Sequence, residues 1–137
     1  MKNVIVTGAA GFIGSFLVEE LIRKNYNVLG LDNFFRGSKD NISHLEKSDN
    51  FTFLEFDLCN KKDTLKSIFI DFNPDFIFHY AAINGTKYFY DIPYEVFRTN
   101  IISTQNLIYA SQETNVKKII YASSSEVYGH NPEVPTS

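Results

Sequence analysis

The stretch Thr7-Gly8-Ala9-Ala10-Gly11-Phe12-Ile13-Gly14 decides the fold of this chain, because it places three glycines between an apolar run and an amphipathic segment. Gly8 permits a tight turn, Gly11 has no Cβ to block an approaching pyrophosphate, and Gly14 lets a helix pack closely on a strand. Unpaired N–H groups and the dipole at the start of that helix attract phosphate. The stretch therefore predicts a strand, a phosphate-binding turn and a helix, as in dinucleotide-binding proteins. A P-loop is excluded, because no Gly-Lys-Ser/Thr follows.

Short apolar runs alternate with segments of helical spacing along the rest of the chain. The runs predict five strands, at Asn3–Thr7, Asn27–Asp32, Phe51–Phe56, Phe76–His79 and Lys118–Ala122. The segments between them predict helices at Gly11–Lys24, Lys61–Phe72 and Tyr94–Glu113. Apolar residues at consecutive positions are typical of parallel strands that are covered on both faces. The alternation predicts right-handed βαβ units, and therefore an α/β fold built on a parallel sheet.

Two polar segments interrupt this pattern. Residues 33–50 contain Gly37 and several Ser and Asn, so we expect a loop above the sheet with one short helix near Ile42–Lys47. Residues 123–137 lose both periodicities and carry two prolines, which predicts a loop. No repeat or linker divides the chain, so we expect residues 1–137 to belong to one domain, with no second domain.

Length, composition and charge limit the class of protein. A chain of 137 residues with 44% hydrophobic and 21% charged residues is typical of one globular domain. Its formal net charge of −3 gives no general attraction to nucleic acid or anionic lipid, so we expect neither partner and expect any phosphate to be held locally. No apolar run is long enough to cross a bilayer. The single cysteine, Cys59, predicts a buried or half-buried thiol in a reducing, cytoplasmic setting.

The second predicted strand ends at an acidic residue, Asp32, about 18 residues beyond Gly14. A carboxylate there accepts hydrogen bonds from the ribose hydroxyls of NAD and repels the 2′-phosphate of NADP. Arg36 lies close by and favours the opposite choice, because an arginine can pair with that phosphate. Weighing both residues, we predict NAD as the cofactor. The alternative is that Asp32 only caps a loop.

Six motifs together carry a resemblance to a known family. They are Gly8-Ala-Ala-Gly11-Phe-Ile-Gly14, Asp32-Asn33, Asp57-Leu58, His79-Tyr80-Ala81-Ala82, Asn100 and Ser123-Ser-Ser-Glu-Val-Tyr-Gly129. In this order and spacing the whole chain resembles the extended short-chain dehydrogenase/reductase family, and within it the NAD-dependent epimerase/dehydratases. The resemblance implies a Rossmann-type doubly wound parallel sheet of strand order 3-2-1-4-5, which stops before the last strands and the substrate domain of that family.

The resemblance also assigns residues to the cofactor. It implies that Asp57 and Leu58 contact the adenine ring and that the Ala81-Ala82 turn lies against the cofactor. Asn100 resembles an asparagine that organises the active-site face, and an equally good alternative is a helix side chain bonded to nearby backbone. The cofactor-binding candidates are Gly8, Ala10, Gly11, Phe12, Ile13, Gly14, Asp32, Asn33, Asp57, Leu58, Ala81, Ala82 and Asn100. No metal site is predicted.

Three catalytic candidates follow the fifth predicted strand. The family's catalytic Ser or Thr lies four residues before the tyrosine of the Val-Tyr-Gly motif, which corresponds to Ser124, with Ser125 as the neighbouring alternative. Such a hydroxyl would hold the substrate's sugar hydroxyl in place. Glu126 occupies a position where relatives carry an acid that assists proton transfer, although a solvated loop carboxylate explains it equally well. Turn chemistry alone also explains a serine triplet.

The main proton-transfer pair of the family, Tyr-x-x-x-Lys, is not present. Tyr80, Tyr121 and Tyr128 all lack a lysine at the fourth following position. We therefore expect the 137 residues alone to be inactive, and their substrate domain to be missing. We also expect the fifth strand to be a hydrophobic edge, with marginal stability or self-association as the consequence. His79 is expected to be structural.

Three hypotheses about function remain open. The first is an N-terminal part of an enzyme that oxidises C4 of a nucleotide sugar with NAD and then epimerises, dehydrates or decarboxylates it. The second is a non-catalytic module that binds NAD or a protein partner. The third is an NADP-linked reductase of the same fold.

Overall fold

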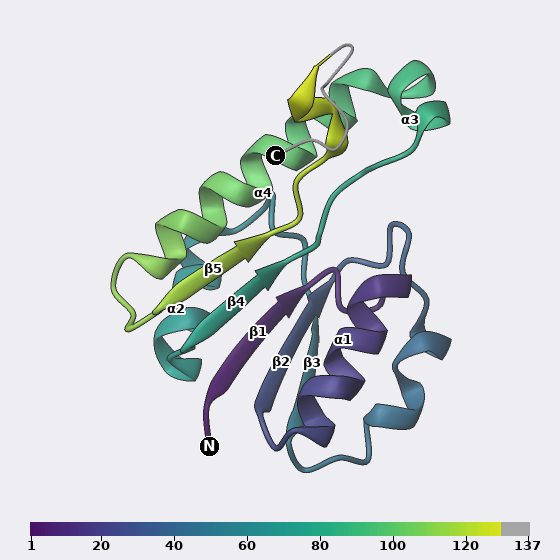
Figure 1. The fold of residues 1–137 in the computed structure, drawn as a ribbon. Helices are drawn as coiled ribbons and strands as arrows, with labels where there is room; N and C mark the ends of the chain where they lie inside the picture. The colour runs from purple at the N-terminus through teal and green to yellow at the C-terminus, as the bar shows by residue number, and fades with distance from the viewer. Residues whose placement is uncertain (130–137) are drawn as a thin grey trace.

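The five apolar runs form one parallel sheet (Figure 1). The computed structural model describes residues 1–129. Its strands are β1 (Asn3–Thr7), β2 (Asn27–Asp32), β3 (Phe51–Glu55), β4 (Phe76–His79) and β5 (Lys118–Tyr121). Its α-helices are α1 (Phe12–Arg23), α2 (Lys62–Phe72), α3 (Thr86–Asp91) and α4 (Pro93–Ser111). All five predicted strands and all three predicted helices are confirmed, with ends that differ by at most two residues.

The sheet has the strand order β3-β2-β1-β4-β5, as predicted for a doubly wound fold. The chain first moves outward from β1 to β3 and then returns across the sheet to add β4 on the other side of β1. The loops after β1 and β4 therefore leave the sheet in opposite directions and open a crevice at the carboxyl ends of these strands. Ligands of open α/β sheets bind at such switch points.

Alternation along the strands divides the core into two layers. Val4 and Val6 pack on one face of the sheet with Val18 of α1, whereas Ile5 packs on the other face with Phe69 of α2. Leu107 of α4 joins the second layer. Figure 1 shows the same arrangement, with α1 on one face and α2 and α4 on the other. Because both faces are covered, the central strands read as continuous apolar runs.

The segment predicted to hold one short helix near Ile42–Lys47 contains two 3-10 turns instead, Lys39–Asn41 and Ser43–Leu45. Ile42 and Leu45 are buried in the α1 layer, and their spacing of three matches a 3-10 turn. Helix α3 was not predicted at all. None of its residues is buried, so no apolar period marks it in the sequence.

The predicted hydrophobic edge at β5 is confirmed among the described residues. Strand β5 pairs there with β4 alone, and Tyr121 is 53% exposed. Ile101 and Ile108 of α4 are also exposed. Marginal stability and self-association stay predictions. None of the helices in the described part of the chain is long and apolar enough to span a membrane.

The helix α1 and the turn before it touch at Gly14. A Cβ placed on Gly14 would lie 2.0 Å from the carbonyl oxygen of Gly8 and 2.8 Å from its carbonyl carbon. Real Cβ atoms do not approach backbone so closely, so a side chain here would push the helix away from the turn. The third glycine of the motif is thus required by packing, as predicted.

We predict that Gly14→Ala destabilises the protein by about 1–3 kcal/mol, because the added methyl overpacks a backbone contact. Helix propensity alone predicts the opposite sign, a gain of about 1 kcal/mol. Urea denaturation of the purified variant distinguishes the two. The exposed Glu19→Ala on the same helix serves as the control and should change the free energy of unfolding by no more than about 0.5 kcal/mol.

Candidate functional site

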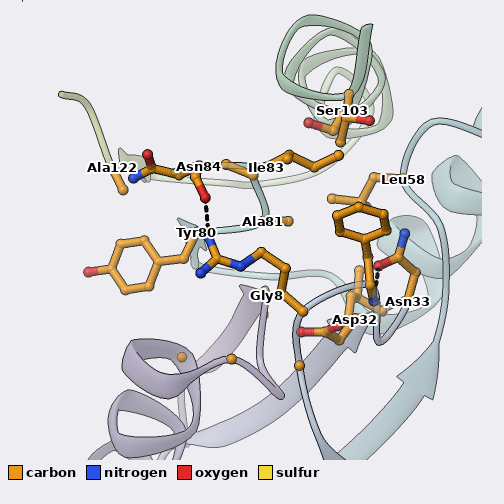
Figure 2. Close-up of a pocket in the computed structure, with 18 of the residues that line it drawn as sticks. Gly8, Asp32, Asn33, Leu58, Tyr80, Ala81, Ile83, Asn84, Ser103 and Ala122 are labelled. Atoms are coloured by element: carbon orange, nitrogen blue, oxygen red, sulfur yellow. Dashed lines mark hydrogen bonds between the residues drawn. The ribbon is translucent and has the colours of Figure 1, made fainter. Parts of the chain in front are cut away.

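A cavity of about 820 Å³ opens at the carboxyl ends of the strands (Figure 2). It is lined by segments that follow β1, β2, β3, β4 and β5 and by the first half of α4. Eleven of the thirteen predicted cofactor residues line it, namely Gly8, Gly11, Phe12, Ile13, Gly14, Asp32, Asn33, Asp57, Leu58, Ala81 and Ala82. The fold thus brings together residues that are up to 74 positions apart in the sequence (82 minus 8).

The glycine turn lies at the N-terminal end of α1 and lines the cavity. Gly8 has a positive φ of 71°, and its N–H donates to the carbonyl of Leu31 at 2.8 Å. Gly11 precedes the first residue of α1, and no described side chain caps the first turn or adds an acid to it. The backbone N–H groups at this end of the helix are therefore available to an anion.

Asp32 ties the end of β2 to the glycine turn. One carboxylate oxygen accepts a hydrogen bond from the N–H of Ala10 at 3.0 Å, and the other accepts one from the N–H of Phe34 at 2.7 Å. The residue is buried, with 8% exposure, yet it lines the cavity. Because a carboxylate can accept about four hydrogen bonds, Asp32 keeps acceptor capacity for a ribose. The loop-capping role and the ligand role are compatible in this residue.

Ala10 lies behind the cavity instead of in its lining. Its side chain is fully buried, and its carbonyl accepts hydrogen bonds from Ser38 N at 3.0 Å and Asn41 Nδ2 at 2.8 Å. Ala10 therefore anchors the loop that follows β2 on the glycine turn.

The loop after β3 is held against α4. Asp57 accepts hydrogen bonds from Cys59 N and Asn60 Nδ2, both at 2.9 Å. Asn106 of α4 donates from its amide nitrogen to the carbonyl of Leu58 at 2.8 Å. Cys59 is half-buried, and burial together with the neighbouring Asp57 raises the pKa of its thiol. The thiol is thus poorly suited to nucleophilic chemistry, in agreement with the sequence interpretation.

A polar network holds the start of the loop after β4. The hydroxyl of Thr7 accepts hydrogen bonds from the N–H groups of Tyr80 and Ala81, so its proton points to His79 Nδ1 at 2.7 Å. His79 Nε2 then donates to Thr104 Oγ1 at 3.0 Å, and Thr104 in turn donates to the carbonyl of Asn100. His79 is only 2% exposed, and this burial lowers the pKa of its imidazole to about 4. His79 is therefore a neutral structural residue, as expected.

Asn100 supports the cavity wall from outside the lining. Its side-chain oxygen accepts from Ile83 N at 2.8 Å, and its side-chain nitrogen donates to Ile83 O at 3.0 Å. Asn100 itself lines a smaller neighbouring cavity. The alternative in which the Asn100 side chain bonds to backbone describes this contact, although the backbone is that of Ile83, 17 residues away in the sequence. It organises the loop that carries Ile83.

Of the serine triplet that follows β5, one residue reaches the cavity. Ser123 lines it, whereas Ser124 and Ser125 are not among its described lining residues. Ser124 accepts the N–H of Val127 through its carbonyl, at the start of the 3-10 turn Ser125–Tyr128. The side chain of Glu126 lies outside the described part of the structure.

Several lining residues were not predicted from the sequence. They include Tyr80, Ile83, Asn84, Arg98, Ser103 and Ser123. Tyr80 and Ser123 follow the ends of β4 and β5, and this position was an available signal, because strand ends converge on the same edge of a parallel sheet. Ser103 lies on α4 and belongs to no motif, so nothing in the sequence indicated that it would line the cavity.

Ser103 gives a direct test of whether the cavity fits a polar ligand. Its hydroxyl is buried, with 1% exposure of the residue, and has no hydrogen-bond partner among the described residues. Helical neighbours on either side, Thr99 and Asn106, contact Cys59 and Leu58, so Ser103 faces the loop after β3. A buried hydroxyl is rarely left unpaired without reason. Together with the free amides of α1 and the acceptor capacity of Asp32, it fits a dinucleotide with a polar base. Residues 1–129 contain no group of three or more His, Cys, Asp or Glu side chains that could hold a metal ion.

Comparison with known proteins shows the family of this chain. Residues 4–137 match the model of the NAD-dependent epimerase/dehydratase family. This chain belongs to that family. Among epimerase/dehydratase relatives, a UDP-glucose 4-epimerase of Mycolicibacterium smegmatis is 38% identical over 98% of this chain. A UDP-N-acetyl-alpha-D-glucosaminuronate decarboxylase of Bacillus cytotoxicus is 36% identical over 93% of it.

A solved structure of the same family agrees with the fold. The UDP-glucose 4-epimerase of Thermus thermophilus in complex with NAD superposes with a TM-score of 0.82 and 33% identity, covering 96% of this chain and 40% of that one. The chain spans 43% of the length of the Mycolicibacterium relative and 38% of the Bacillus relative. The similarity therefore concerns about two fifths of each relative.

The buried, neutral His79 makes the stability of the protein depend on pH. The unfolded chain binds a proton near pH 6.5, but the folded chain does so only near pH 4. The contribution of His79 to stability is thus complete above about pH 6.5, falls as the pH drops towards 4, and is lost below that, by about 3 kcal/mol in total.

We predict that His79→Gln, which keeps one acceptor and one donor, flattens the pH dependence of unfolding between about pH 6.5 and 4. Urea denaturation at a series of pH values measures this difference against the original protein. His44→Gln, which removes an exposed histidine, serves as the matched control. A profile of the His79 variant that stays parallel to the original would refute the assignment.

Proposed function

We propose that this chain binds NAD in the cavity and forms the cofactor-binding part of an enzyme that acts on a UDP-linked sugar. The observation that carries the proposal is the convergence of the glycine turn, Asp32, the Asp57-Leu58 loop and the Ala81-Ala82 turn on one cavity. NAD is the ligand of the related structure from Thermus, and UDP-sugars occur in the names of both sequence relatives. The presence of a single cysteine supports a cytoplasmic location.

Each part of the cavity has a role in holding the cofactor. The free N–H groups of Phe12 and Ile13, in the first turn of α1, would hold the pyrophosphate, and Asp32 would accept the hydroxyls of the adenosine ribose. The loop at Asp57 and Leu58, facing Ser103, would receive the adenine base. NAD, when bound, supplies a hydride acceptor for oxidation of the sugar at C4.

The reaction that follows oxidation differs between the two relatives named above, one being an epimerase and the other a decarboxylase. We propose Ser124, with Ser125 as its alternative, as the hydroxyl that orients the sugar at C4, and Glu126 as an acid that assists later proton transfer. The support for this proposal is that these residues follow Ser123, which lines the cavity, in the segment after β5. The described residues contain no tyrosine followed by lysine at the fourth position, so proton transfer by such a pair is not assigned to this part of the chain.

Calorimetric titration of the full chain with NAD and NADP tests the cofactor proposal. We expect saturable binding of NAD and weaker binding of NADP, because the Asp32 carboxylate repels a 2′-phosphate. Asp32→Asn should reduce the preference for NAD by about tenfold, since it removes the charge. The amide oxygen can still accept from Ala10 N, but the acceptor for Phe34 N is lost, so the fold of the variant is checked by urea denaturation. A folded chain that binds neither dinucleotide contradicts the proposal, and a preference for NADP favours a reductase of the same fold.

The orphan hydroxyl of Ser103 provides a second, independent prediction. If it bonds the adenine base, Ser103→Ala should weaken NAD binding by about fivefold, as expected for one neutral hydrogen bond. Ser111→Ala is the matched control, because the Ser111 hydroxyl on the same helix already donates to Leu107 O at 2.7 Å. Equal NAD affinities of the two variants would exclude a role for Ser103 in binding.

A further inference from the structure

The cavity contains a charge imbalance that the proposed cofactor would make worse. Its lining holds three carboxylates, those of Asp32, Asp57 and Glu95, and two guanidinium groups, those of Arg36 and Arg98. Arg98 lies 3.8 Å from Glu95 and is therefore already beside an acid. A dinucleotide would bring two further negative charges on its pyrophosphate. Free backbone N–H groups carry only partial positive charge, so a full cation close to them would stabilise the phosphates further.

Arg36 is the lining cation that has no carboxylate partner within residues 1–129. Its guanidinium donates to the carbonyl of Asn84 and lies 5.4 Å from the centre of the Tyr88 ring. A carbonyl and an aromatic ring attract a cation but do not neutralise it. Arg36 is also exposed, so it can exchange these contacts without disturbing the core.

The backbone places Arg36 beside the phosphate-binding turn. The next residue, Gly37, packs so closely that a Cβ on it would lie 2.9 Å from both the carbonyl carbon and the Cβ of Ala10. Ser38 then donates to the carbonyl of Ala10 at 3.0 Å. Arg36 is thus one residue from direct contact with the turn that opens α1.

The guanidinium of Arg36 contacts the loop after β4 and forms no ion pair with Asp32 in the described structure. The side chain starts from the loop after β2 and reaches Asn84 and Tyr88, which follow β4. Figure 2 shows this contact as the dashed line at Asn84, across the cavity from Asp32 and Asn33. A group that bound the 2′-phosphate would have to lie at the Asp32 end, where the ribose is expected. The pyrophosphate of a dinucleotide joins its two nucleosides, so it would lie between the two ends of the cavity.

We infer that Arg36 is the cation that binds the pyrophosphate of the dinucleotide, in place of its contact with Asn84, and that it does not select between NAD and NADP. The inference rests on the proposed function. Arg36 belongs neither to the glycine motif nor to the strand-end position of Asp32.

Calorimetric titration of the full chain with NAD and NADP, at low and at high salt, tests this role. Arg36→Gln should weaken the binding of both dinucleotides by about tenfold and reduce the salt dependence of both dissociation constants, because a charged contact to a shared group is lost. Arg36→Lys should recover part of the affinity, since it keeps the charge but loses the bidentate fork. Lys39→Gln makes the same charge change in the same loop, outside the cavity lining, and should leave both affinities unchanged.

Each other outcome has a definite meaning. Loss of NADP affinity alone would show that Arg36 binds the 2′-phosphate and would overturn the inference. Unchanged affinities for both dinucleotides in Arg36→Gln would also overturn it and leave Arg36 as a link between two loops. If the unsubstituted chain binds no dinucleotide, the proposed function itself fails, and this inference fails with it. The unsubstituted chain therefore separates the two failures.

Discussion

The contact between Gly14 and the carbonyl of Gly8 is the constraint on which the site depends. It sets the distance between α1 and the end of β1, and so determines where the free N–H groups of the helix point. Gly8 is equally confined on its other side, because a Cβ there would lie 2.9 Å from the backbone of Tyr80 and Ala81. One turn is thus pressed between a helix and the loop after β4. Any side chain at either glycine would move a wall of the cavity.

Apolar packing alone does not fix the directions of the loops at the strand ends. The two core layers hold the sheet and its helices, and they include only a few residues of the loops beyond the strands, such as Ala9, Ile42 and Leu58. Hydrogen bonds fix the directions of the loops beyond these layers. Thr7 and His79 bind the start of the loop after β4, Asn100 binds Ile83 further along it, and Asp32 binds the glycine turn. Buried polar groups of this kind give a unique geometry when all of them are paired.

Local patterns were sufficient for most of the fold and for eleven of the residues that line the cavity. The strands are apolar at consecutive positions, the glycine spacing is specific, and Asp32 lies at a recognisable strand end. Helix α3 and the contacts of Arg36 and Ser103 could not be predicted in this way. Helix α3 buries nothing, Arg36 meets a carbonyl 48 residues away, and Ser103 is defined by the absence of a partner in the described structure. Such features exist only after the chain has folded.

The cavity is divided between two halves of the sheet. Asp32, Asn33 and Asp57 come from the side of β2 and β3, whereas Tyr80, Ala81 and Ser123 come from the side of β4 and β5. Strand β1 separates the halves and supplies the turn that both of them touch. Arg36 also crosses between the halves, because it follows β2 and donates to the carbonyl of Asn84, which follows β4. The glycine turn and Arg36 thus join the two halves, so a displacement of one half would be transmitted to the other through these contacts.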